Sequence, residues 1–257
     1  MDFSEQYIAL RTIVVRELRR FLRIWIQTVL PAVITMALYF VIFGNLIGSQ
    51  IGDMDGFKYM DYIVPGLIML SVITNSYGNV VSSFYSAKFQ RNVEEMLVSP
   101  VPNYIILLGY TAGGLMRGLI VGAAVTVVSL FFTQLQVYSY FVVVSIIMMT
   151  SILFSLAGFI NAVFANSFDD ISIVPTFVLT PLTYLGGIFY SISMLPDFWQ
   201  IVSLFNPILY MVNAFRYGFL GTSDTNLLHS YLIISIAIIS LYTFCLYLLN
   251  TGKGIRS

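Results

Sequence analysis

Long apolar segments, separated by short polar intervals, run through most of the chain. A helix needs about 20 residues to cross a hydrocarbon layer about 30 Å thick. Six segments reach about this length, at residues 24–47, 62–84, 104–132, 140–165, 171–190 and 228–250. This pattern predicts an all-α polytopic membrane protein with six transmembrane helices.

Residues 1–23 have the pattern of an amphipathic helix instead. Apolar residues recur every three or four positions along one side, while five arginines lie between residues 11 and 23. Asp2 and Glu5 have the spacing of a capping box. We expect this helix to lie in the headgroup layer of an anionic leaflet, with a partner-binding helix as the alternative.

The interval 88–102 is a substantial polar stretch between two predicted spans. At helical spacing it has two faces. The apolar face consists of Phe89, Val93, Met96 and Leu97, and the charged face consists of Arg91, Glu94 and Glu95. A helix over 89–99 is roughly 15 Å long, too short to cross a membrane, and Pro100 and Pro102 end it. It is either a solvated connection or a docking element that receives force from another protein.

Two of the predicted spans carry polar residues. Ser71, Asn75 and Asn79 share one face of the second span, and Arg117 lies in the third span beside glycines spaced four residues apart over 114–122. Such glycines let two helix backbones approach closely. The polar face either packs against another helix or lines a wetted path, and Arg117 either fixes helix packing or contacts substrate.

The interval 191–221 combines spanning length with internal breaks. Residues 198–220 are long enough to cross, but Asn206 and Pro207 divide them into two pieces that are each too short. We therefore expect a re-entrant hairpin, which also contains Pro196 and Arg216, rather than a seventh span.

Basic residues are unequally distributed over this six-span topology. Nine of the twelve lie in the two termini and in the second and fourth connections, whereas Lys58 and Arg216 lie opposite and Arg117 lies in the membrane. Because positive charge favours the cytoplasmic side, we expect both termini and the amphipathic interval there. The fourth connection also holds Asp169 and Asp170, whose position before the fifth span is typical of helix capping.

Chemistry that the sequence lacks narrows the function further. It has one histidine, His229, and one cysteine, Cys245, too few for most metal sites or nucleophilic constellations within one chain. Lys253 lies between two glycines, which does not match a phosphate loop. We expect no catalytic residue, metal, bound cofactor or nucleic acid. Intramembrane acids are sparse, which disfavours the alternative of an ion-gradient-driven secondary transporter.

Residues 175–221 begin with a proline-interrupted apolar span. Their sequence is PTFVLTPLTYLGGIFYSISMLPDFWQIVSLFNPILYMVNAFRYGFLG. This stretch resembles the signature of ABC-2 type transporter permeases, and the matching residues are Gly186, Gly187, Leu195, Pro196, Asn206, Pro207, Tyr210 and Arg216. With the stretches IGDMDGF, YIVPGL and FDDISIVPTFVLTPLTYLGG, the whole chain is similar to the YadH-type permeases of Gram-negative bacteria.

The resemblance implies the transmembrane subunit of an ABC exporter with type V architecture, in the bacterial inner membrane with both termini cytoplasmic. Two copies form the pathway, and two copies of a separate cytoplasmic ATPase bind ATP and Mg. It assigns residues 1–23 to the membrane surface near the ATPase, 24–257 to the transmembrane domain, 89–99 to the coupling helix and 191–221 to the hairpin. Membrane lipids and an amphiphilic substrate of unspecified chemistry are further expected partners.

Overall fold

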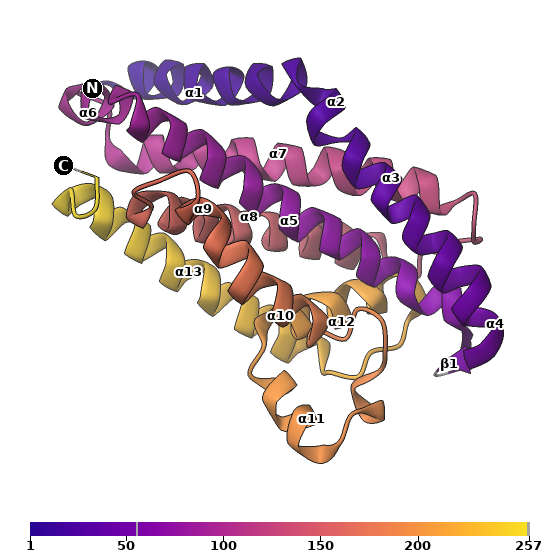
Figure 1. Ribbon diagram of the computed structural model, residues 1–257. Coiled ribbons are helices and arrows are strands. Elements are labelled where there is room, and N and C mark those ends of the chain that lie inside the picture. Colours follow the sequence, from indigo (N-terminus) through magenta and orange to yellow (C-terminus); the bar gives the residue numbers. More distant parts are fainter. Residues whose placement is uncertain (55, 256–257) are drawn as a thin grey trace.

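The computed structural model describes residues 1–54 and 56–255, apart from the side chains of Asn45 and Ser49. Its bundle is formed by four long helices: α5 (Tyr59–Phe89), α7 (Asn103–Ser129), α8 (Tyr140–Phe164) and α13 (Leu227–Thr251). Figure 1 shows these helices running side by side. Arg256, one of the nine basic residues counted above, lies outside the described residues.

Helix α5 lies at the centre of the bundle, in contact with both α7 and α8. Its core residues, such as Leu67, Ile68 and Val72, are fully shielded. Ser71 and Asn79 on the same helix are buried against protein as well. A membrane helix can carry this many polar side chains because they face other helices rather than lipid.

The glycines of α7 form a close-packed seam, as predicted. A side-chain carbon at Gly114 would collide with Ser155 of α8 and Val80 of α5, and one at Gly118 would collide with Ser76. Without these side chains α7 approaches both neighbours closely, which confirms the predicted role of the small residues.

The N-terminal helix α1 (Phe3–Arg23) begins with the predicted capping box, in which the Asp2 N–H donates to Glu5 Oε2 at 2.9 Å. Its buried face, which includes Ile13, packs on α7. The first residues of its apolar stripe, Phe3 and Tyr7, are 83% and 62% accessible, whereas Phe21 of the same stripe is fully buried. Exposed apolar side chains beside a membrane bundle favour the boundary between headgroups and acyl chains for this first part of the helix.

The chain leaves helical geometry at Ile24 and turns into the first predicted span (Figure 1). This span consists of α2 (Trp25–Thr28), α3 (Leu30–Tyr39), the π-helix η1 (Phe40–Ile47) and α4 (Gly48–Ile51). Pro31 lies in the first turn of α3, where its missing N–H removes no helical hydrogen bond. A short hairpin of β1 (Asp53–Met54) and β2 (Phe57–Lys58) then leads into α5.

The region of the predicted fifth span is shorter than expected. It holds three helical pieces of five residues each, α9 (Asp170–Val174), the π-helix η2 (Pro175–Leu179) and α10 (Thr180–Tyr184). Together they extend for roughly 22 Å, less than the hydrocarbon layer. The helix stops before Gly187, whose φ of 68° lies in the left-handed region that favours glycine.

Three further helices follow: the 3₁₀-helix η3 (Ile192–Met194), α11 (Asp197–Leu204) and α12 (Pro207–Leu220). Pro196 is the N-cap of α11, and α11 and α12 meet at an angle of 88°. Five helical segments of the described chain are long and apolar enough to cross a membrane, or six if the bent pair counts as one span. This is an all-α polytopic membrane fold.

Candidate functional site

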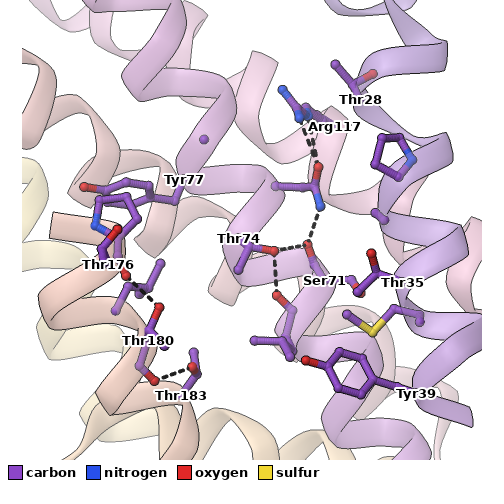
Figure 2. A pocket seen from close by; sticks show the side chains of 18 of the residues that line it. Thr28, Thr35, Tyr39, Ser71, Thr74, Tyr77, Arg117, Thr176, Thr180 and Thr183 are labelled. Atoms are coloured by element: carbon purple, nitrogen blue, oxygen red, sulfur yellow. Dashed lines mark hydrogen bonds between the residues drawn. The ribbon is translucent and has the colours of Figure 1, made fainter. Parts of the chain in front are cut away.

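A cavity of about 620 Å³ lies between the α2–α3 segment and the run from η2 to α10, with α5 as its floor (Figure 2). Its volume is in the range of ligand pockets in proteins. Hydroxyl side chains from all three walls line it: Thr28, Thr35, Ser71, Thr74, Thr176, Thr180 and Thr183. We call this cavity the groove.

Most of these hydroxyls donate their proton to a backbone carbonyl of their own helix. Ser71 Oγ donates to Leu67 O at 3.1 Å, and Thr74 Oγ1 donates to Leu70 O at 2.9 Å. A hydroxyl whose proton is used in this way keeps its lone pairs as acceptors. These walls therefore offer acceptors to a bound molecule.

Arg117 reaches the groove from α7 (Figure 2), and its guanidinium donates hydrogen bonds to the Asn75 side chain. Arg117 Nη2 and Nε lie 3.1 Å and 3.3 Å from Asn75 Oδ1. The Asn75 amide in turn donates to Ser71 O at 3.0 Å. Ser71, Asn75 and Arg117, three of the four residues that the sequence placed on a pathway or packing face, therefore meet in one cavity.

Asn79, the fourth of those residues, lies outside the groove and joins α5 to α1. Its Oδ1 accepts a hydrogen bond from Arg20 Nη2 at 2.8 Å. Arg20 also forms an ion pair with Glu17 at 3.2 Å, and Glu17 Oε2 accepts from Ser83 Oγ at 2.6 Å. Asn79 is therefore a packing residue.

No pattern in the sequence assigns a role to Glu17, which is almost completely buried in the structure. The available signal was its position: it stands four residues after Ile13 and four before Phe21, on the face that packs against α7. A buried carboxylate requires partners, and here two arginines and Ser83 provide them.

The amphipathic interval forms a shorter helix than the predicted 89–99. Helix α5 continues to Phe89, and Arg91 takes a left-handed conformation with φ of 62°, so that α6 covers only Asn92–Val98. This break separates Phe89 from the other apolar residues of the predicted face. A non-glycine residue in this conformation gives no clear signal in a sequence.

The apolar face of α6 turns toward its own bundle. Val93 is 1% exposed, and Met96 and Leu97 are partly buried against the same core. A docking element that offered this apolar face to a partner would need Val93 free, but its side chain is already covered by its own bundle. The exposed surface consists of Arg91, Asn92, Glu94, Glu95 and Val98.

Phe89 connects α5 to the turn after α8. It is 65% exposed, and its ring centroid lies 5.2 Å from that of Phe168, which also contacts Tyr85 at 4.9 Å. Lys88 Nζ donates to Val163 O at 2.6 Å near the end of α8. No sequence pattern assigns a role to Phe168, because an exposed phenylalanine in a short turn has no periodic pattern around it.

The two aspartates of that turn differ in their contacts. The Asp170 carboxylate accepts from the backbone N–H of Asn166 at 2.9 Å and from Ser167 Oγ at 2.8 Å. These hydrogen bonds to the charged form, the one from Asn166 first, hold the pKa of Asp170 below its ordinary value. Asp169 is the N-cap of α9 but makes no side-chain cap bond.

Arg216 and Asn206 fasten the predicted hairpin to the bundle. Arg216 is 1% exposed, its Nη2 donates to Gly187 O at 2.6 Å, and its guanidinium stacks 3.8 Å from the centre of the Tyr62 ring. Asn206 Nδ2 donates to Leu182 O of α10 at 2.6 Å, and its Oδ1 caps α12 by accepting from Ile208 N at 3.0 Å. Pro207 fills the first helical position of α12. Both polar residues have structural contacts.

A substrate-sized groove in a bundle of membrane helices is typical of a transport permease. A family model described as ABC-2 type transporter matches residues 8–220, and the chain belongs to this family.

Among known proteins, the chain is 59% identical over 251 residues to the inner membrane transport permease YadH of Escherichia coli (strain K12), covering 98% of both chains. It is 22% identical over 210 residues to nodulation protein J of Rhizobium leguminosarum bv. viciae, covering 81% of this chain and 79% of that protein. It is also 24% identical over 180 residues to nodulation protein J of Rhizobium meliloti (strain 1021). The predicted membership of the ABC-2 permeases and the similarity to the YadH type are confirmed.

Proposed function

We propose that this chain is the transmembrane subunit of an ABC exporter in the bacterial inner membrane. Two copies of the chain form the substrate pathway, and two copies of a separate cytoplasmic ATPase bind ATP and Mg and drive transport. Membership of the ABC-2 family supports a partner of this kind.

One observation carries this proposal: α5 forms both the floor of the groove and the attachment of α6. Asn75 lines the groove, and the same helix continues to Phe89, shortly before α6 begins at Asn92. The stretch from Asn75 to Phe89 is roughly 21 Å of continuous helix. Because Val93 packs α6 against the bundle, force on the exposed face of α6 displaces α5 as a unit.

The groove supports a pathway formed by two copies. It is a partly open cavity, so that one chain lines it without enclosing it. A second copy that faces the same opening closes the space around a substrate. Rocking of the spans then exposes the groove to the two sides of the membrane in turn.

We also propose a six-span topology, in which residues 171–190, whose helical part is α9, η2 and α10, form the fifth span and α11 and α12 form a re-entrant hairpin. Figure 1 shows α6 and the C-terminal end of α13 at one end of the bundle, and α11 and the β-hairpin away from it. The basic residues of α1, together with Lys88 and Arg91 just before α6, favour the cytoplasm for that end. This topology agrees with the type V architecture that the resemblance implies.

Reconstitution with a candidate ABC ATPase subunit from the same organism tests the proposal. Proteoliposomes should accumulate a fluorescent amphiphile only when ATP and Mg are supplied, and ionophores that remove ion gradients should leave the rate unchanged. The double change Glu94→Arg and Glu95→Arg should abolish transport while hydrolysis continues, whereas Asp53→Arg in the β-hairpin should have no effect. Transport by the chain alone along an ion gradient would instead identify a secondary transporter.

A further inference from the structure

Arg117 is a cation in the middle of the bundle, and no acidic side chain of the described residues pairs with it. It lies roughly 21 Å along α7 from Asn103. None of the ion pairs among the described residues involves it, and its only acceptor there is Asn75 Oδ1. A guanidinium has five N–H donors, so about three remain available. A charge at this depth is unfavourable unless it pairs or meets water.

Asn75 holds this guanidinium in place without neutralising it. Because its amide nitrogen donates to Ser71 O, the amide oxygen points at Arg117. No acidic residue of the described chain lines the groove. Glu17, the buried acid of α1, is already paired with Arg16 and Arg20. The charge of Arg117 therefore remains available to a molecule that enters the groove.

The opposite wall adds a second preference. Thr180 Oγ1 donates to Pro175 O at 2.9 Å and Thr183 Oγ1 donates to Thr180 O at 2.7 Å, so both oxygens face the groove as acceptors. A headgroup that carries an anion and also hydroxyl donors satisfies Arg117 and these oxygens together.

We propose that the groove recognises amphiphiles with an anionic, hydroxyl-bearing headgroup, and that Arg117 binds the anion. This inference rests on the proposed function, because it takes the groove as the substrate pathway. The anionic group belongs either to a single-chain amphiphile or to a phospholipid of the bilayer, and the two sources share the same contact with Arg117.

Photolabelling of the purified transporter in neutral maltoside micelles tests this inference. The probe is lysophosphatidylglycerol with a diazirine in its acyl chain, and the labelled peptides are identified by mass spectrometry. Unlabelled lysophosphatidylglycerol should compete at a concentration at least ten-fold below that of the monoacylglycerol with the same acyl chain, which lacks only the phosphate-linked group. If two-chain phosphatidylglycerol competes with equal potency, the anionic group belongs to a bilayer lipid. If two-chain phosphatidylglycerol does not compete, the anionic group belongs to a single-chain amphiphile.

Four variants separate recognition from folding. Arg117→Gln should remove the ten-fold preference, and Arg117→Lys should retain most of it. Asn75→Asp places a carboxylate beside the guanidinium, so it should also remove the preference without lowering the melting temperature. Lys58→Gln removes an exposed charge outside the groove and should keep the native preference.

Equal competition by the anionic and neutral amphiphiles in the native protein would overturn the inference, as would a preference that survives both Arg117→Gln and Asn75→Asp. Neither result is evidence for or against the proposed function, which is tested separately by ATP-driven transport in proteoliposomes. Anion-selective labelling without ATP-driven transport would contradict the proposed function and leave the headgroup site standing.

Discussion

Arg20 of α1 donates to the side chain of Asn79 on α5, one helical turn from Asn75 in the groove. The same guanidinium pairs with Glu17, whose carboxylate also binds Ser83 of α5. Through these contacts the interfacial helix is fixed to the helix that forms the floor of the groove. We call this cluster, Glu17, Arg20, Asn79 and Ser83, the α1–α5 lock.

The α1–α5 lock should contribute measurably to stability. Arg20→Gln leaves Glu17 with a weaker set of partners, so we expect a loss of about 1–3 kcal/mol of unfolding free energy. Arg19→Gln removes the same charge from an exposed position and should change stability little. Thermal unfolding in detergent measures both variants. Equal melting temperatures for the two variants would show that the lock has no net effect.

The close contact between α8 and α5 should depend on Gly158, which has no side-chain carbon. A Cβ at Gly158 would lie 2.6 Å from Tyr77 O, a backbone atom that cannot rotate away, whereas a Cβ at Gly78 meets nothing within 4 Å. Gly158→Ala should therefore cost about 1–3 kcal/mol. Gly78→Ala should be neutral or stabilising by up to about 1 kcal/mol. Melting temperatures that fall equally for both variants would contradict the close approach.

Two valines of α6 should separate folding from coupling. Val93 is 1% exposed and Val98 is 86% exposed. Val93→Ala should lower the melting temperature, because it removes buried apolar contacts worth about 1–2 kcal/mol. Val98→Ala should leave the melting temperature unchanged and weaken binding of the ATPase subunit. The reverse assignment of the two effects would mean that α6 presents its other face to the partner.

Arg216 should hold the α11–α12 segment in place. Arg216→Gln loses the hydrogen bond to Gly187 O and the stacking on Tyr62, and we expect a loss of about 2–4 kcal/mol. Limited proteolysis should then cut residues 191–206 more rapidly. Lys58→Gln serves as the control, because Lys58 is exposed. Unchanged proteolysis in the Arg216 variant would show that other contacts hold the segment.

Periodic features of the sequence predicted much of this architecture. The long spans, the capping box of Asp2 and Glu5, the glycine seam of α7 and the break at Asn206 and Pro207 all follow from local spacing. Local patterns report the faces of a helix and the points where it stops, so these features are accessible without a structure.

Contacts between residues that lie far apart in the sequence cannot be predicted from local sequence patterns. The partners of Glu17 include Ser83, 66 positions away, and Phe89 meets Phe168 from another turn. A sequence does not state what covers an apolar stripe, so it does not reveal that the apolar face of α6 packs on its own bundle. The sequence predicts a longer fifth span because its apolar composition continues past Tyr184, where the helix ends.

Labelling of an introduced cysteine tests the central claim most directly. Cys245 is fully buried, so Glu95→Cys on α6 would carry the reactive thiol. A membrane-impermeant maleimide should label this variant from the cytoplasmic side alone, and the bound ATPase subunit should protect it. Lys58→Cys should be labelled from the opposite side regardless of the ATPase. Labelling of position 95 from outside, or labelling that the ATPase does not reduce, would contradict a cytoplasmic coupling surface on α6.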